Sequence, residues 1–130
     1  MRILGFSKRW QKLSNPEFTT FRFPRKDADW QLGEVVQIVY KPRTKNREVL
    51  GVAKVVNKEP RCMAWQGSKL TEAKVTNTEA IADGFQSGET KGIKYHAYYF
   101  MWEFLWDSYG GERLLNEPMN KLTLRKIGDW

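Results

Sequence analysis

The segment from Glu34 to Lys41 restricts the possible folds more than any other part of this sequence. It reads Glu-Val-Val-Gln-Ile-Val-Tyr-Lys, so β-branched and aromatic side chains fall on both faces of an extended chain. A strand that is apolar on both faces has to be covered on both, which places it inside a sheet. Residues 48–57 are also rich in valine, and a basic turn containing Pro42 separates the two segments. Together they predict a long antiparallel hairpin.

The remaining segments extend this hairpin into an α+β order. Further strands are expected at residues 3–6, 17–23 and 121–127. Helical segments are expected at residues 7–14, 79–83 and 94–108. The helix at 79–83 follows the capping-box spacing from Thr76 to Glu79. Short turns between consecutive strands favour an antiparallel, barrel-like sheet, so we expect a single α+β domain over residues 1–130.

Positive charge is concentrated in the first half of the chain. Residues 1–61 contain 14 Lys and Arg against 6 Asp and Glu, whereas residues 62–130 contain 8 and 9. The formal net charge is +7. A basic half of this kind attracts polyanions, of which nucleic acid is the most common. The alternative is that the charge only maintains solubility.

Several classes of protein are excluded by what the sequence contains. Cys62 is the only cysteine and cannot form an internal disulfide, which favours a reducing, cytoplasmic compartment. The longest apolar run, from Ala97 to Trp102, is far shorter than the ~20 residues that span a bilayer, so no membrane association is expected. His96 is the only histidine, and no P-loop or Rossmann motif is present, so we predict no metal and no organic cofactor. A monomer is expected.

Basic side chains supply candidate contacts to a nucleic acid. Cations occupy every second position from Lys41 to Arg47 and would share one face of an extended ribbon, although a solvated turn has the same composition. Arg22 lies in an apolar strand, where a charged side chain needs a specific role. Its neighbours Phe21 and Phe23 are expected in the core.

Tryptophans near these cations are the second kind of candidate. Trp10 and Trp65 could each stack on a base, or could equally cap the sheet. The predicted nucleic-acid contacts are Lys8, Arg9, Trp10, Arg22, Arg25, Lys26, Arg43, Lys45, Arg47, Arg61, Trp65 and Lys69.

Several strings, in their order along the chain, resemble the ASCH family, a branch of the PUA-like superfamily. They are Phe18-Thr19-Thr20-Phe21-Arg22, Trp30-x-x-Gly33-Glu34-x-Val36-x-Ile38, Glu79-Ala80-Ile81-Ala82-Asp83-Gly84-Phe85 and Lys121-Leu122-Thr123-Leu124. The resemblance implies a β-barrel of about five or six mostly antiparallel strands, with two or three helices packed beside a cleft. It also implies that this cleft binds RNA or a nucleotide-like ligand.

The chain departs from the family's cleft motif, G-x-K-x-x-E-x-R, which corresponds to residues 15–22. Only the final arginine is retained, as Arg22, whereas Glu17 replaces the lysine and Thr20 replaces the glutamate. Some small ASCH proteins resemble amidohydrolases of acetylated cytidine that use Lys, Thr and Glu, and Thr20 stands where such a threonine would be. Lys8 or Lys69 would have to take the place of the missing lysine.

Three functions therefore stay open from the sequence. The first is an RNA- or nucleotide-binding module that uses a basic cleft. The second is a small hydrolase of a modified nucleoside or RNA, with Thr20 as nucleophile or positioning hydroxyl and Glu17 or Glu79 as general base. The third is a protein-interaction domain that presents the same basic face to an acidic partner.

Overall fold

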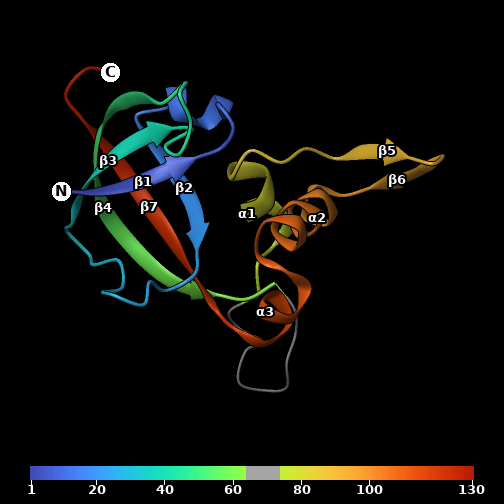
Figure 1. The fold of residues 1–130 in the computed structure, drawn as a ribbon. Helices are drawn as coiled ribbons and strands as arrows, with labels where there is room; N and C mark the ends of the chain where they lie inside the picture. Colours follow the sequence, from blue (N-terminus) through green and yellow to red (C-terminus); the bar gives the residue numbers. More distant parts are fainter. Residues whose placement is uncertain (64–73) are drawn as a thin grey trace.

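Five strands form one curved sheet in the computed structural model, which describes residues 1–63 and 74–130. Its strands are β1 (Arg2–Phe6), β2 (Glu17–Arg22), β3 (Val35–Tyr40), β4 (Glu48–Arg61) and β7 (Met119–Ile127). They lie in the order β1-β3-β4-β7-β2. β1 runs parallel to β3, and the other neighbours are antiparallel. Figure 1 shows the strands wrapping around a common interior.

The α+β class predicted from the sequence is confirmed, and the sheet is mixed. Within the described residues the pairing ends at β1 on one side and at β2 on the other, so no closed barrel is found. The predicted hairpin is confirmed, and its second strand continues to Arg61 because β4 pairs with β7 as well as with β3. Val36 and Ile38 are fully buried, as expected for a strand inside the sheet.

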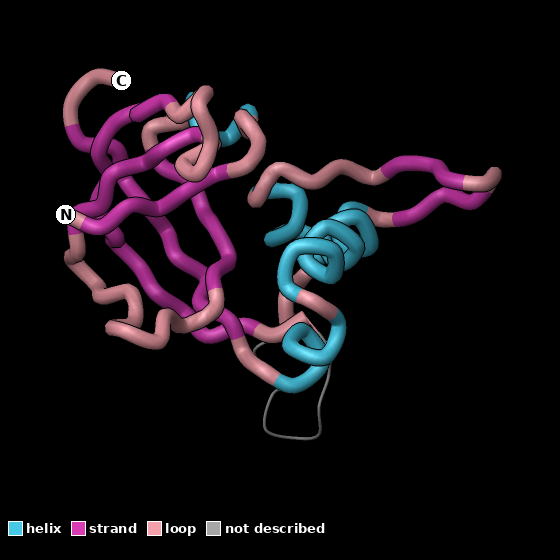
Figure 2. The backbone as a smooth tube through the Cα atoms, viewed as in Figure 1, coloured by secondary structure: helices cyan, strands magenta, loops and turns pink. Residues whose placement is uncertain are grey.

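The helices gather beside one end of the sheet (Figure 2). They are α1 (Asn77–Ala82), α2 (Ala97–Tyr109) and α3 (Gly111–Asn116), whereas the short 3-10 helix η1 (Gln11–Ser14) lies on the sheet, apart from them. No helix in the described ranges, 1–63 and 74–130, is long and apolar enough to cross a membrane.

A short hairpin projects from the helical side and corrects one prediction (Figure 1). It consists of β5 (Gly88–Thr90) and β6 (Ile93–Tyr95), and residues 88–95 are called the arm below. The aromatic helix was expected to begin at Lys94, but that residue lies in β6 and the helix begins at Ala97. The reason is the turn at Lys91 and Gly92, whose positive φ angles, 50° and 76°, are those of a two-residue hairpin turn.

Two clusters of buried apolar side chains make up the core. One lies within the sheet and includes Leu4, Ile38 and Leu122. The other lies between the sheet and the helices and includes Met101. Trp10 packs against both clusters, so it joins the interior of the sheet to the helical part.

The start of α1 provides a direct test of the local sequence reasoning. The side chain of Thr76 accepts a hydrogen bond from the backbone N–H of Glu79, and the Glu79 carboxylate accepts one in return from the Thr76 backbone. We expect Thr76→Ala to lower the free energy of unfolding by about 1 kcal/mol, because it removes one half of this capping box. Urea unfolding measures the change.

Thr78→Ala is the matched control, since Thr78 is an exposed residue of the same helix. We expect that substitution to change the unfolding free energy by less than about 0.5 kcal/mol. Equal effects of the two substitutions would show that the cap does not stabilise the protein.

Candidate functional site

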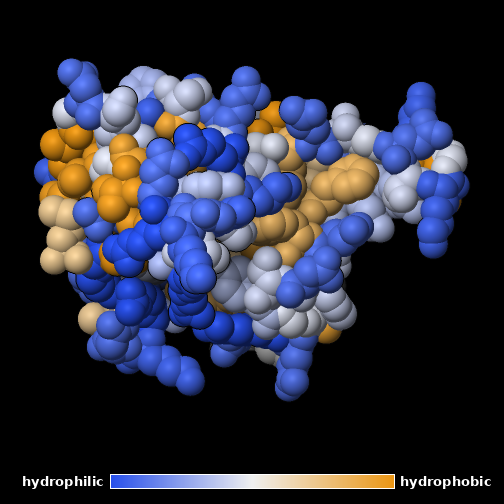
Figure 3. Space-filling model, turned by 45° about the horizontal axis from the view of Figure 1, so that its top comes forward, coloured by the Kyte–Doolittle hydropathy of each residue, from blue (hydrophilic) through white to orange (hydrophobic). Residues whose placement is uncertain are grey.

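A cleft of about 860 Å³ lies between the sheet and the helices. One wall is formed by the ends of β1 and β2, η1 and the turn that follows β3. The other wall is formed by the end of α1 and one face of α2. In the space-filling view, an apolar area is visible between hydrophilic side chains on either side (Figure 3).

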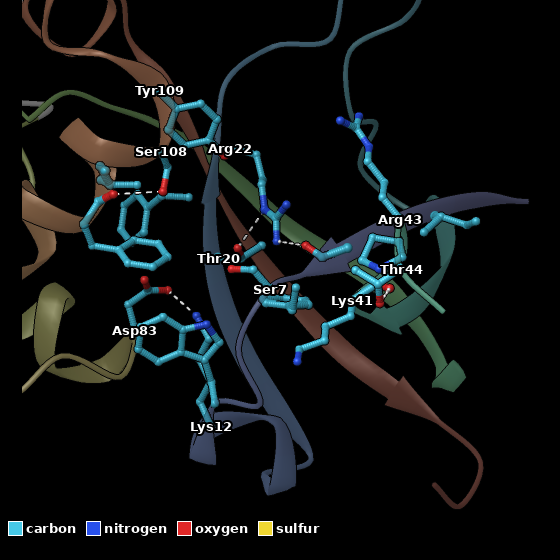
Figure 4. Close-up of a pocket in the computed structure, with 18 of the residues that line it drawn as sticks. Ser7, Lys12, Thr20, Arg22, Lys41, Arg43, Thr44, Asp83, Ser108 and Tyr109 are labelled. Carbon is cyan, nitrogen blue, oxygen red and sulfur yellow. Dashed lines mark hydrogen bonds and ion pairs between the residues drawn. The ribbon is translucent and has the colours of Figure 1, made fainter. Parts of the chain in front are cut away.

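A buried ion pair closes one end of the cleft (Figure 4). Lys12 Nζ, on η1, lies 2.7 Å from Asp83 Oδ1 at the end of α1, and the two side chains are 6% and 9% exposed. Thr19 Oγ1 also donates to Asp83 Oδ1, at 3.4 Å. Burial lowers the pKa of Lys12 and raises the pKa of Asp83, while the attraction between the two groups opposes both shifts.

The position of Asp83 depends on the glycine that follows it. Gly84 has a φ of 114°, which ends α1 in a conformation that other residues rarely adopt. A Cβ at this position would also lie 2.9 Å from Cε3 of Trp10. Gly84 therefore allows Trp10 to pack closely against the end of the helix, beside the ion pair.

Arg22 lies on the cleft and is held by the sheet (Figure 4). Its Nε donates to Thr20 Oγ1 at 3.0 Å, and its Nη2 donates to the carbonyl oxygen of Gly5 at 2.7 Å. The guanidinium carbon is 4.8 Å from the ring centroid of Phe6. Within the described part of the chain, no carboxylate forms an ion pair with Arg22, and Nη1 donates to no residue.

The charge of Arg22 persists despite its surroundings. Burial lowers the pKa of the guanidinium, and the nearby Tyr109 and Asp83 groups oppose this shift. Arginine remains protonated in proteins even when it is buried. The cleft therefore contains a fixed cation with hydrogen-bond donors that no described residue uses.

The turn after β3 adds further cations to the same wall of the cleft as Arg22. Lys41, Arg43 and Arg47 line it, and the Lys41 backbone N–H donates to the Phe6 carbonyl at 2.8 Å. Asp83 is the only acidic residue among the described lining residues, and its charge is balanced by Lys12. The cleft therefore has a clear excess of positive charge.

Aromatic side chains form part of the helical wall. The ring of Trp10 lies 5.1 Å from that of Phe85 and 5.5 Å from that of Phe104. Lys8 Nζ lies 4.7 Å from the Trp10 centroid, at the edge of the same group. Trp10 therefore packs in an aromatic cluster and lines the cleft at the same time.

The structure places some predicted contact residues in the cleft and others elsewhere. Thr20, Trp10, Arg22, Arg43 and Arg47 line it together. The residues outside the lining are Lys8, Arg9, Arg25, Lys26, Lys45 and Arg61. Trp65 and Lys69 lie outside the described residues.

Ion pairs account for several of the cations outside the cleft. Arg9 pairs with Glu48, and Arg25 pairs with Asp27. Arg61 pairs with Glu59 and with Glu79 of α1.

The two predicted general bases do not line the cleft either. Glu17 is exposed at the edge of the sheet, where its register partner in β7 is Arg125, and the two form an ion pair at 3.1 Å. Glu79 pairs with Arg61 and with Lys121. Both carboxylates are thus engaged away from Thr20.

Lys12 and Asp83 are the site residues that the sequence reasoning missed. Asp83 lies within the string from Glu79 to Phe85, on which the family resemblance partly rests. Its place in that string could have identified it as a site residue. Lys12 lies next to Leu13, which is buried, and a lysine on the buried side of a short helix is unusual.

Comparisons with known proteins, by family models, by curated sequences and by solved structures, found no match to this chain.

The Lys12–Asp83 pair leads to a prediction about stability. Lys12→Met or Asp83→Asn alone should lower the free energy of unfolding by about 3–5 kcal/mol, because each leaves a buried charge without its partner. The double variant should recover much of this loss, since no uncompensated charge remains. A double-mutant cycle from urea unfolding measures the coupling.

Arg113 and Glu117 provide the matched control. Their Nε and Oε2 atoms are also 2.7 Å apart, but the side chains are 41% and 55% exposed. The corresponding cycle for this pair should give a coupling below about 0.5 kcal/mol. A buried pair that couples no more strongly than the exposed one would contradict the prediction.

Proposed function

We propose that this protein binds a nucleotide-like ligand, as RNA or as a free nucleotide, in the basic cleft. The observation that carries the proposal is the state of Arg22. It is a charged guanidinium held by Thr20 and Gly5, it faces the cleft, and it has no carboxylate partner among the described residues. A fixed cation of this kind is suited to an anion or to a pair of acceptor atoms on the ligand.

The rest of the cleft supports a ligand with both phosphate and base. The cations of the turn after β3, Lys41, Arg43 and Arg47, are suited to phosphate oxygens. The rings of Trp10, Phe104 and Tyr109 offer apolar and stacking contacts to a base. The volume of about 860 Å³ falls within the range of small-molecule sites, which is ~300–1,000 Å³.

The resemblance to the ASCH family is part of the same proposal. That resemblance places a ligand between a barrel-like sheet and its helices. Its structural support here is the position of the cleft, which is bounded by the curved sheet and by α1 and α2. We include three further points in the proposal. The fold is PUA-like, the protein is a monomer, and it is located in the cytoplasm.

Salt-dependent binding is the first test. We expect single-stranded RNA and nucleoside monophosphates to change the fluorescence of Trp10, and their affinity to fall as salt is raised. Arg22→Met should weaken binding about tenfold or more, because a hydrogen bond to a charged group contributes about 1.5–3 kcal/mol. Titrations with single-stranded RNA, duplex RNA and DNA at two salt concentrations measure both effects.

Arg25→Met is the control, because Arg25 also lies over an aromatic ring, that of Trp30, but outside the cleft. Its affinity for nucleotides should match that of the wild type. Equal losses of nucleotide affinity in Arg22→Met and Arg25→Met would show that binding depends on overall charge attraction and not on the position of Arg22 in the cleft. Binding of an acidic protein but of no nucleotide or nucleic acid would favour the protein-interaction alternative.

A hydrolase is the second candidate, and it is favoured by the presence of Thr20, Lys12 and Asp83 in the lining of one cleft. All three line the cleft, and Thr20 has its hydroxyl oxygen bonded by Arg22. In this proposal Lys12 and Asp83 take the acid–base roles first considered for Glu17 and Glu79. Burial moves the pKa values of both groups towards neutrality, which is the range in which proton transfer is efficient.

Acetylated cytidine is the substrate to test for this second function. We expect Thr20→Val to reduce turnover by at least about 100-fold, since it removes the hydroxyl, and Thr20→Ser to restore part of it. Affinity for cytidine monophosphate should be kept by Thr20→Ser, which retains the hydroxyl that accepts from Arg22 Nε. Turnover that is unchanged by Thr20→Val would exclude the assigned role, and absence of turnover in the wild type would leave the binding function alone.

A further inference from the structure

A second groove lies at the opposite end of α1 from Asp83. It has a volume of about 570 Å³ and is bounded by the first residues of α1 and α2 and by the base of the arm. α1 has six residues and is therefore about 9 Å long. The groove and the cleft thus lie at the two ends of one short helix.

Tyrosines and cations dominate the groove. Tyr95, Tyr98 and Tyr99 line it together with Lys74 and Lys94, and no acidic residue is among its described lining residues. Glu103, on α2, lies close enough to the Tyr99 hydroxyl to raise its pKa. The groove therefore combines aromatic surface with positive charge.

Two of these tyrosines already form a stacked pair. The rings of Tyr95 and Tyr99 are 4.1 Å apart with an interplanar angle of 19°. Lys74 Nζ lies 5.1 Å from the ring centroid of Tyr98. Rings with adjacent ammonium groups are the combination that binds single-stranded nucleic acid without regard to sequence.

Neighbouring contacts hold the groove in shape. The side-chain oxygen of Asn77 accepts a hydrogen bond from the Tyr98 backbone N–H at 3.0 Å, which ties the start of α1 to the start of α2. Tyr98 also donates its hydroxyl proton to the Met63 carbonyl. Tyr95 contacts Phe100, which fixes the base of the arm on α2. The stacked rings are thus positioned before any ligand arrives.

We propose that this groove is a second contact site for single-stranded nucleic acid. A base stacks against the Tyr95–Tyr99 pair, and Lys74 and Lys94 contact the phosphates on either side of it. This inference extends the proposed function. It rests on that function only in taking the ligand to be a nucleic acid. An oligonucleotide can reach both sites, because stacked nucleotides advance about 3.4 Å each, whereas a mononucleotide occupies the cleft alone.

The exposed lysines give the sharpest test, because their substitution leaves the core intact. Lys94→Met and Lys74→Met should each weaken binding of a 12-residue oligoadenylate and reduce the salt dependence by about one released ion. Lys91→Met is the matched control, since Lys91 is an exposed lysine of the same arm that does not line the groove. None of the three should change the affinity for adenosine monophosphate.

The stacking contact is tested on α2. Tyr99→Leu should weaken oligoadenylate binding about 5- to 100-fold, the usual effect of losing one base–aromatic stack, and Tyr99→Phe should retain most of the affinity. Hydrogen exchange of the arm amides shows whether the leucine variant keeps the hairpin.

Each result has a distinct meaning. Oligoadenylate binding that is unaffected by Lys74→Met and Lys94→Met, or equally weakened by Lys91→Met, overturns the groove as a site. Losses in the groove variants together with insensitivity to Arg22→Met support the groove and reject the cleft proposal. Absence of binding to any nucleic acid by the wild type rejects both.

Discussion

The ion pair between Lys12 and Asp83 is the interaction on which the rest of the site depends. It connects η1, which packs on the sheet, to the end of α1, and so joins two parts of the chain 71 positions apart. Removing two charges from water is costly, and the packing of Trp10 against Phe85 beside the pair offsets part of that cost. Because the pair fixes the helical wall relative to the sheet, it also fixes the width of the cleft in front of Arg22.

The distribution of ion pairs explains why the total charge is a poor guide to the site. Much of the positive charge in the first half is used structurally, as in Arg2 with Glu34 and Lys58 with Asp29. Arg22, the arginine proposed to contact the ligand, has no such carboxylate partner within the described residues and is held by Thr20 and Gly5 instead. The pairing of each cation, which depends on the fold, therefore decides its role.

Local features of the fold could be predicted from the sequence, whereas features set by distant contacts could not. The run of β-branched and aromatic residues within 34–41 predicted β3, and the Thr76–Glu79 spacing predicted the capping box. Glu17 was misplaced as a base because its register against β7 directs it to Arg125 at the sheet edge. Helix α3 was missed because Gly110, which ends α2, also precedes a new helix. The aromatic residues before α2 fit a helix or a strand equally, and only the turn at 91–92 decides between them.

The arm enters and leaves the domain at one place, since Gly88 is the register partner of Tyr95. A hairpin attached in this way contributes little to the two core clusters, so its length is free to vary between related chains without disturbing the sheet. A longer or shorter hairpin would change how far this edge of the molecule extends and would leave the packing of both core clusters in place.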